Sequence, residues 1–600
     1  MQTTLRHWEY FNLTEKYSEL YSKAKEGYRF YKLYDLITSR ENIALAYRTI
    51  KTNKGSKTVG TDRINVDYLK SLTEDELVML IRSKLSNYQP KKVRRVFIPK
   101  PNGDKRPLGI PSIIDRIIQL CFKQVLEPIA EAQFYQHSYG FRPLRSTHHA
   151  IARAQHLINS GGFHHVVDID IKGFFDNINH TLLLKQLWTM GIRDRIVLRI
   201  ISKMLKAEIQ GEGIPTKGTP QGGILSPLLS NIVLHDLDMW VDSQWDSFKT
   251  NYPYIQNSHK LRALKRASNL KEGYIVRYAD DFKIFCRDWK SANKWFHAVR
   301  LYLKDRLKLD ISSEKSQIIN LRKRKSEFLG FQIWAEKKKK YVAQTSLSNK
   351  KKHNIISEGK KRIKDIQKEP STRTARLYNS WVLGLHQYFN KATYVNRSFG
   401  NINNKLAIFR FNRLKDVSTY GYPINAPPEF LGIYSTTYKT HKIGDTYLLP
   451  LSDVRHKTQM NFSQSYTPYT SEGRALIYKQ LDINIQFEIA KLFNSKLPNR
   501  SIEYSDNRIS RYSMKLGKCE ITGWFLPAEF VHCHHYIPIS LGGDDSFQNL
   551  RIIHKDIHIL IHATNKNTIQ KLIKELKLSY QQIKKINSYR KVCNLELVES

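Results

Sequence analysis

The run YIVRYADDFKIFC at residues 274–286 places two adjacent aspartates between two apolar segments. Its β-branched and aromatic residues predict a strand, a tight turn and a second strand, with Asp280 and Asp281 at the turn. Two neighbouring carboxylates with apolar flanks are costly to bury unless a cation neutralises them. A surface Asp-Asp turn is the ordinary alternative, but the apolar flanks on both sides favour a buried hairpin. The run therefore predicts a hairpin that carries a cation site.

A second acidic run, HHVVDIDIKGFFDNINH, begins at His164 and predicts a strand over residues 166–171. Asp168 and Asp170 are two residues apart and point to the same side of that strand. Asp170 and the two turn acids could together hold two divalent ions roughly 3.5–4 Å apart. Hard oxygen ligands favour Mg²⁺ or Mn²⁺ over zinc.

The charge balance restricts the partners of this chain. Its 600 residues include 98 Lys and Arg against 54 Asp and Glu, a formal net charge of +44. Such a surplus repels itself in a compact particle unless a polyanion neutralises it, so nucleic acid is the expected partner. We expect no membrane association, because no long apolar stretch and no signal-like start are visible. The five scattered cysteines predict a reducing compartment without disulfides.

Composition changes after residue 335. Residues 336–373 hold thirteen Lys and Arg against four Asp and Glu, 13 − 4 = +9, which predicts a domain boundary near 335/336. A solvated surface is the ordinary reading of any single lysine there. The next run places Leu377, Trp381, Leu385 and Tyr388 at helical spacing, so we expect an amphipathic helix whose aromatic residues lie in the core.

Several further blocks, together with YADD (278–281) and DIKGFF (170–175), resemble the reverse transcriptases encoded by bacterial group II introns. In chain order they are VGTDRIN (59–65), RRVFIPKPNGDKRPLGIPSIIDRIIQ (94–119), SYGFRPLRSTHHAI (138–151), GTPQGGILSPLLSNIVLHDLD (218–238) and EFLGFQI (327–333). Each block is weak alone, but they follow the order of the family. The resemblance implies an α+β multidomain chain, with the fingers and palm of a right-hand polymerase and a helical thumb or maturase domain.

The resemblance assigns roles residue by residue. It makes Asp170, Asp280 and Asp281 the catalytic ligands of two Mg²⁺ ions, and gives Asp168 no catalytic position, which leaves it as a strand acid for a backbone or basic partner. Phe175 falls where the family excludes the ribose 2′-hydroxyl, which would favour dNTPs; from composition alone it would be a core residue. The other implied substrate-binding residues are Lys100, Arg106, Gln221, Gly222 and Lys315.

The basic segment matches the thumb and maturase region of the family, where the resemblance implies binding of group II intron RNA. Independently, a Lys-rich stretch beside amphipathic helices would bind phosphate without reading sequence. The expected RNA-binding residues are Lys350, Lys351, Lys352, Lys360, Lys361 and Arg362.

The last ninety residues concentrate histidine. A strand-like run over 530–538, a glycine pair, a short strand over 550–553 and a helix over 554–562 carry His534, His535, Asn549, His558 and His562. His558 and His562 are four apart, which suits two imidazoles on one metal. Exposed helical histidines are the ordinary alternative.

The upstream histidine pair makes this block resemble the HNH, or ββα-metal, nuclease motif. The resemblance implies that His535 is the catalytic general base, that His534, His558 and His562 hold one divalent ion, and that Asn549 fixes the loop. Intron proteins often add two Cys-x-x-Cys pairs for structural zinc. Here Thr522 stands where the mate of Cys519 would be, and His554 and Ile557 replace the second pair. A four-thiolate zinc site is therefore not expected, although a makeshift site using Cys519, Cys533, His532 or His554 is conceivable.

These patterns predict fingers and palm at 1–335, a thumb or maturase domain at 336–450, a DNA-binding region at 451–510 and an HNH endonuclease domain at 511–600. The predicted function is intron mobility: splicing assistance, nicking of target DNA, and copying of intron RNA from the exposed 3′-end. A splicing-only RNA-binding protein and a reverse transcriptase with another role, such as phage defence, stay open, as does homodimer formation. The expected location is the bacterial cytoplasm at the nucleoid, or an organelle.

Overall fold

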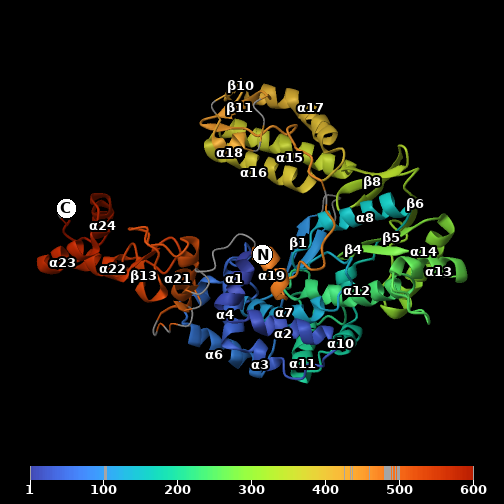
Figure 1. The fold of residues 1–600 in the computed structure, drawn as a ribbon, viewed down its shortest axis with the longest axis horizontal. Helices are drawn as coiled ribbons and strands as arrows, with labels where there is room; N and C mark the ends of the chain where they lie inside the picture. Colours follow the sequence, from blue (N-terminus) through green and yellow to red (C-terminus); the bar gives the residue numbers. More distant parts are fainter. Residues whose placement is uncertain are drawn as a thin grey trace. The chain divides into compact units, whose positions relative to one another are not determined.

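The computed structural model describes residues 2–598, except 100–104, 270, 425, 433, 435, 436, 459, 479–487, 490, 493, 494, 496, 498 and 499. Two compact units are present (Figure 1). One consists of residues 1–134, 175–233 and 465–600, and the other of residues 135–174 and 234–464. We refer to them as the split unit and the sheet unit. No described helix is both long and apolar enough to cross a lipid bilayer.

The sheet unit is built around a four-stranded antiparallel sheet with the order β4-β5-β3-β6. The strands are β3 (His165–Ile169), β4 (Tyr274–Tyr278), β5 (Asp281–Cys286) and β6 (Gln317–Asn320). Two helices, α8 (Thr147–Gly161) and α14 (Trp289–Leu301), pack against it. The acidic strand and the hairpin predicted from sequence are thus neighbouring members of one sheet.

The same unit continues into a second sheet and a group of helices. Strands β7 (Ser326–Phe328), β8 (Phe331–Lys337) and β9 (Tyr341–Leu347) form an antiparallel sheet. Helices α15 (Asn349–Lys368), α16 (Thr372–Phe389) and α17 (Val395–Leu414) follow, and α15 packs on both others (Figure 1). One hydrophobic core joins both sheets and these helices. The domain limits drawn from composition stay a prediction; β8 itself runs through residues 335 and 336.

Helix α16 forms where the amphipathic pattern predicted one, and the aromatic residues of that pattern, Trp381 and Tyr388, are partly buried and pack against the core. Leu377 of the same pattern is 54% exposed. The buried residues are Ala375, Tyr378, Val382, His386 and Phe389. Apolar residues occupy two adjacent stripes of this helix, and the spacing of one stripe cannot tell which of them faces the neighbouring helices.

The remaining described elements of the sheet unit are short or peripheral. They are α13 (Asn257–Ala267), the π-helical turn Tyr302–Arg306, β10 (Thr419–Gly421), α18 (Pro428–Leu431), β11 (Thr440–Ile443) and β12 (Thr446–Tyr447). Helix α12 (Ser226–Ser243) contributes residues to both units.

The split unit is mainly helical in its first part. Its longest element there, α7 (Ile113–Glu131), is buried on most of its circumference and begins at Ser112, whose hydroxyl accepts a hydrogen bond from the Asp115 N–H. The other helices are α1 (Gln2–Tyr10), α2 (Thr14–Lys25), α3 (Tyr34–Ile37), α4 (Arg40–Lys51), α5 (Asp67–Lys70), α6 (Glu74–Ser86), α9 (Phe174–Asn177), α10 (His180–Thr189) and α11 (Arg195–Leu205). Strands β1 (Arg94–Pro99) and β2 (Lys105–Ile110) pair antiparallel.

The C-terminal part of the split unit has the order helix, strand, strand, helices. Its elements are α19 (Ser471–Tyr478), α21 (Ile502–Met514), the 3-10 turns Ala528–Phe530 and Ile539–Leu541, β13 (Val531–His535), β14 (Leu550–His554), α22 (Lys555–His562), α23 (Lys566–Leu576) and α24 (Tyr580–Val592). Strands β13 and β14 are antiparallel, and α22 follows β14 directly. This is the strand, strand, helix succession that the histidine-rich sequence predicted.

Buried ion pairs attach helix α21 to helix α4. The Asp506 carboxylate is paired with both Arg48 and Lys51. Glu503 accepts hydrogen bonds from the Tyr47 hydroxyl at 3.0 Å and from Lys51 at 3.2 Å. Burial alone would raise the pKa of Asp506, but the two cations outweigh burial and lower it. The C-terminal part is therefore joined to the first helices by charges that are costly to separate.

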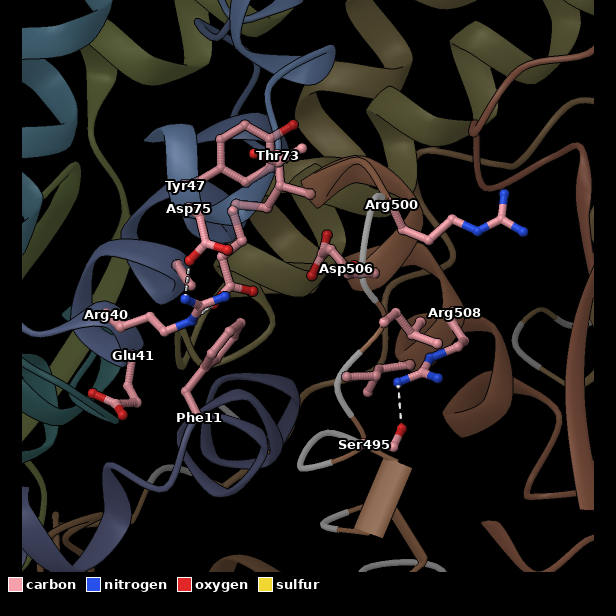
Figure 2. Close-up of a pocket in the computed structure, with 16 residues that line it drawn as sticks. Phe11, Arg40, Glu41, Tyr47, Thr73, Asp75, Ser495, Arg500, Asp506 and Arg508 are labelled. Atoms are coloured by element: carbon pink, nitrogen blue, oxygen red, sulfur yellow. Dashed lines mark hydrogen bonds and ion pairs between the residues drawn. The ribbon is translucent and has the colours of Figure 1, made fainter. Parts of the chain in front are cut away.

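A pocket of about 810 Å³ lies at this joint (Figure 2). Its arginines already have partners within the chain. Arg40 pairs with Glu74 and Asp75, and Arg508 donates to the Ser495 hydroxyl at 3.1 Å. The pocket is thus part of the packing between α4, α6 and the C-terminal part.

Candidate functional site

The register between β3 and β5 brings distant acids to one edge of the sheet. Asp168 lies opposite Lys283 and Ile169 opposite Phe282. The same register extended by one residue sets Asp170 across from Asp281. Directly opposite residues of an antiparallel pair project from the same face with Cβ atoms about 4.5–5.5 Å apart. Asp170 and the 280–281 turn therefore share one edge, as the two-ion interpretation requires.

The turn between β4 and β5 is tight and strained. Tyr278 pairs with Asp281, so only Ala279 and Asp280 form the loop. Ala279 has φ +58°, a left-handed conformation that costs an L-residue about 1–2 kcal/mol. Hairpins use such turns because their twist matches that of the strands, and glycine is the usual residue there. This chain has alanine, so other groups must stabilise the turn.

Two features that sequence reasoning missed stabilise it. Arg277 is fully buried, donates to the Ala279 carbonyl at 2.8 Å, and grips the buried Asp238 carboxylate through Nε and Nη2 at 2.6–3.0 Å. Gly140 packs against the turn so closely that a Cβ there would overlap the Ala279 nitrogen. Arg277, Asp238 and Gly140 stand in the family-like blocks quoted above, which was the available signal, but spacing did not reveal that they meet.

The charge environment of the acids is uneven. Asp281 is half-buried, and burial raises its pKa to about 6; Lys283 lowers it, while Asp168 and Asp280 raise it further. Lys283 is itself buried and pairs with Asp168 at 2.6 Å, which is the basic partner expected for that strand acid. Asp170 is more exposed, and the Lys315 ammonium lies 3.6 Å from its carboxylate. The half-buried Asp281 carboxylate beside those of Asp168 and Asp280 favours a cation site, because a divalent ion would offset the cost of burial and the repulsion between the acids.

The predicted substrate residues of the split unit lie around two glycine turns. Gln221 donates its side-chain amide to the Asp176 carboxylate at 3.3 Å, and Gly109 N–H donates to the Gln221 carbonyl at 2.8 Å. Gly222 has φ +118°, and a Cβ there would lie 2.6 Å from the Gly109 carbonyl oxygen. The Phe175 carbonyl accepts a hydrogen bond from the Thr219 N–H at 2.7 Å. The 218–222 loop is thus fixed to its neighbours by backbone contacts that only glycine permits.

Two basic residues of the 94–119 block, Lys100 and Arg106, are predicted to bind substrate. Arg106 is exposed on β2, opposite Ile98 of β1. Lys100 and the adjoining turn at 101–104 lie outside the described residues.

The basic residues of α15 are divided between surface and internal contacts. Lys350, Lys351, Lys360 and Lys361 are exposed. Burial lowers the pKa of Lys352, and the nearby charges of Lys325, Arg397 and Lys405 lower it further. These four residues form a concentration of positive charge. Arg362 pairs with Glu358 at 2.9 Å and lies 5.5 Å from the Trp381 ring centre. Arg362 therefore contacts neighbouring side chains, as does Lys360, whose ammonium lies 5.6 Å from the Phe409 ring centre.

In the C-terminal part, His535 and Asn549 are held by precise contacts. The His535 Nε2 lies 2.7 Å from an Asp545 carboxylate oxygen, a partner that sequence reasoning missed. That hydrogen bond, then the Ser501 hydroxyl and the charges of His535 and Arg500, lower the pKa of Asp545 against the effect of burial. Asn549 accepts from the Ile537 N–H at 2.8 Å and donates to the Ile537 and Asp544 carbonyls at 2.9 and 2.8 Å. It closes the loop between the two strands, the task that the resemblance gave it.

The other histidines form one cluster. The ring centres of His534 and His562 are 5.3 Å apart, those of His534 and His558 5.4 Å, and those of His558 and His562 4.8 Å. His532 stacks on His558 at 3.6 Å. Burial lowers the pKa of His534 and of His558 to about 3, so both are neutral at physiological pH and able to bind a metal. Cys593, which sequence reasoning did not select, has its sulfur within 4.8 Å of ligand atoms of His534 and His562.

The makeshift zinc site is not assembled. Among the described residues, the potential metal-binding groups include neither Cys519 nor Cys533. The Cys519 sulfur instead accepts a hydrogen bond from the Thr522 N–H at 3.4 Å. The adjacent Glu520 carboxylate accepts from Arg511 at 2.8 and 2.6 Å and from the Ile552 N–H at 3.0 Å. A charged side chain therefore ties this turn to α21 and β14.

Comparison with known proteins identifies the family. Residues 98–333 match the profile "Reverse transcriptase (RNA-dependent DNA polymerase)". Protein YkfC of Escherichia coli is 36% identical over 307 residues, which are 48% of this chain and 80% of that protein. The chain belongs to the reverse transcriptase family.

Other relatives are named for introns. "Group II intron-encoded protein LtrA" of Lactococcus lactis subsp. cremoris is 35% identical over 346 residues, 51% of this chain and 57% of that protein. "Putative COX1/OXI3 intron 1 protein" of Saccharomyces cerevisiae is 29% identical over 337 residues, 50% of this chain and 39% of that protein. This reverse transcriptase thus spans only about half the length of its intron-named relatives. The matched family segment includes Asp170, Asp280 and Asp281 and ends before the histidine cluster.

The packing of Gly140 against the acidic turn generates a test. We expect Gly140→Ala to lower the free energy of unfolding of this reverse transcriptase by about 1–3 kcal/mol, because the new methyl group must displace the backbone of the turn. Thermal or urea unfolding of the purified protein measures the change.

Gly384→Ala is the matched control. Gly384 lies inside α16, where a Cβ would meet nothing within 4 Å, so this variant should gain up to about 1 kcal/mol. Equal tolerance of both substitutions would contradict the proposed close packing.

Proposed function

We propose that this reverse transcriptase is an intron-encoded RNA-directed DNA polymerase that assists splicing of a group II intron and nicks the target DNA of that intron. The observation that carries the polymerase proposal is the convergence of Asp170 with Asp280 and Asp281 on one sheet edge inside the matched family segment. The intron proposal is supported by relatives that are named as intron proteins.

Asp170, Asp280 and Asp281 would hold two Mg²⁺ ions through carboxylate oxygens. Such ions supply activation of an attacking 3′-oxygen and stabilisation of the leaving pyrophosphate. The chain itself contributes the placement of the acids: Arg277 and Gly140 fix the turn, and Lys283 with Asp168 keeps one face of the sheet neutral. Lys315 beside Asp170 would approach the leaving phosphate. Gln221 and Gly222 would line the nucleotide site, and Phe175 would exclude the 2′-hydroxyl of ribonucleotides.

The polymerase proposal predicts the effect of removing one carboxylate charge. Asp280→Asn should reduce Mg²⁺-dependent extension of oligo(dT) on poly(rA) about a thousandfold, equivalent to roughly 4 kcal/mol of transition-state stabilisation. The variant should still bind RNA, because that function uses other surfaces. Asp310→Asn, which changes an exposed acid of the same unit, is the control and should keep full activity. Undiminished synthesis by Asp280→Asn would refute the carboxylate site.

The exposed lysines of α15 support the RNA-binding proposal. Lys350, Lys351 and Lys361 project from one helix and share their unit with the cationic group around Lys352. Phosphates displace counterions from such a surface, so affinity falls with salt in proportion to the number of contacts.

Two measurements follow from the RNA-binding proposal. Sequencing the RNA that co-purifies with the protein should return a group II intron; random cellular RNA would favour the non-intron alternative. Lys350→Glu, Lys351→Glu and Lys361→Glu combined should reduce the slope of log affinity against log salt by about 2–3. Lys290→Glu with Lys294→Glu, on exposed sites of α14, should leave the slope unchanged.

A second candidate activity, DNA nicking, is favoured by the contact between His535 and Asp545. A carboxylate that accepts a hydrogen bond from one imidazole nitrogen orients the ring and supports the other nitrogen as a general base. His535 would then take the proton of the attacking water. One divalent ion bound by the neighbouring histidines would supply stabilisation of the leaving 3′-oxygen.

The nicking proposal is tested separately from synthesis. His535→Ala should lower the rate of DNA nicking by about 10²–10⁴-fold and leave primer extension unchanged. Asp545→Asn should lower nicking less, because the base remains. His259→Ala, an exposed histidine of α13, serves as the control. Loss of both activities in His535→Ala, or of neither, would contradict two independent sites.

A further inference from the structure

The last long helix, α24, delivers a cysteine to the histidine cluster. The Cys593 sulfur and one ring nitrogen each of His534 and His562 lie within 4.8 Å of one another. Cys593 stands far beyond the strand, strand, helix segment in sequence, at the C-terminal cap of α24. Three different elements, β13, α22 and α24, therefore converge on one point.

The position of Cys593 is fixed by a buried arginine one helical turn earlier. Arg590 is 2% exposed and donates from Nη1 to the carbonyls of Leu560, Ile561 and Ala563 at 2.8, 3.0 and 2.8 Å. These carbonyls belong to the end of α22, where helical partners run out. Arg590 therefore clamps α24 onto the helix end that carries His562 and holds Cys593 beside it.

His534 supplies an independent sign that something binds here. Its side chain is buried, at 2% exposure, and its Nε2 has no hydrogen-bond partner among the described residues. A buried polar atom left unsatisfied costs about 1–3 kcal/mol. The imidazoles of His558 and His562 and the ring of Tyr589 surround it, with ring centres 5.3–5.7 Å away. A metal ion accepting the Nε2 lone pair would remove that cost.

We propose that Cys593 is a thiolate ligand of the divalent ion held by His534 and His562, and that the ion is therefore zinc-like rather than magnesium. This proposal concerns the same ion as the nicking proposal above and rests on that proposal. It adds which residues bind the ion and which metal the ion is. Two imidazoles and a sulfur form a borderline-soft donor set that suits Zn²⁺ and disfavours Mg²⁺.

The geometry is compatible with this donor set after a small closure. Zn–S bonds of about 2.3 Å and Zn–N bonds of about 2.0–2.1 Å in a tetrahedron place ligand atoms roughly 3.3–3.7 Å apart, so the three side chains need to approach by about 1 Å. With His534, His562 and Cys593 as its protein ligands, in place of the His534, His558 and His562 set that the resemblance implies, the ion keeps its fourth tetrahedral position for water or a substrate oxygen, as in catalytic zinc sites. Cys593 loses its proton when the ion binds.

Cobalt substitution of the full-length protein tests the assignment without relying on activity. Co²⁺ added to metal-free protein should give the visible bands of tetrahedral Co²⁺ and a near-ultraviolet thiolate-to-cobalt charge-transfer band. Cys593→Ser should lose the charge-transfer band and bind Zn²⁺ at least about tenfold more weakly. Cys593→His should regain affinity but not the band, because imidazole replaces the sulfur. Cys533→Ser, on the opposite face of β13 from His534, should behave as the unmodified protein.

Each outcome decides the proposal. A charge-transfer band that survives in Cys593→Ser, or no band in the unmodified protein, would overturn the thiolate ligand. Equal Zn²⁺ affinity of Cys593→Ser and Cys593→His would overturn it as well, since a merely structural cysteine gains nothing from a ligating replacement. Thermal unfolding of both metal-free variants shows that they fold. Failure of the nicking proposal looks different: the unmodified protein then shows the cobalt spectrum but does not cut DNA.

Discussion

The buried ion pair between Arg277 and Asp238 is the interaction on which the acidic edge depends. Both side chains are fully buried, and Arg277 also donates from Nη1 to the Ala279 carbonyl. Breaking a buried pair of this kind costs about 3–5 kcal/mol because the remaining charge stays unsolvated. That energy exceeds the 1–2 kcal/mol of an alanine at positive φ. The left-handed turn is therefore imposed by α12 and β4, and Asp280 and Asp281 occupy fixed positions before any ion binds.

The fixed positions matter because the acids repel one another. Asp281 is half-buried beside Asp168 and Asp280, and its raised pKa reflects both its partial burial and the repulsion of these acids. The chain relieves part of it through Lys283, which is committed to Asp168 and so cannot neutralise the whole group. The unrelieved part favours a cation at the open edge, where Asp170 is half exposed. The fixed turn and the unneutralised negative charge therefore both favour cation binding at this edge of the sheet.

Sequence patterns predicted the local elements well and the long-range contacts poorly. The acidic hairpin, its partner strand, and the strand, strand, helix order around His534 follow from periodicity and turn residues, and the structure contains them. The convergence of Asp170 with the turn came from the family resemblance, because strand order cannot be read from one strand. The Arg277 contact with Asp238, the Asp545 partner of His535 and the approach of Cys593 depend on tertiary packing between segments whose own patterns are ordinary.

In the C-terminal part, charged side chains join the turn at Cys519 to its neighbours. With Thr522, His554 and Ile557 at the three other positions, Cys519 has no partner thiolates for a four-thiolate zinc site. Glu520 performs the cross-link by accepting from Arg511 of α21 and from the Ile552 N–H of β14. Helix α21 is in turn held by Arg48 and Lys51 of α4 through Asp506. A chain of buried or half-buried charges thus runs from the first helices to the strands that carry His534 and His535. The framework of the histidine cluster therefore depends on the N-terminal helices, and a fragment that begins at residue 511 would lose most of α21, including the Asp506 that pairs with Arg48 and Lys51.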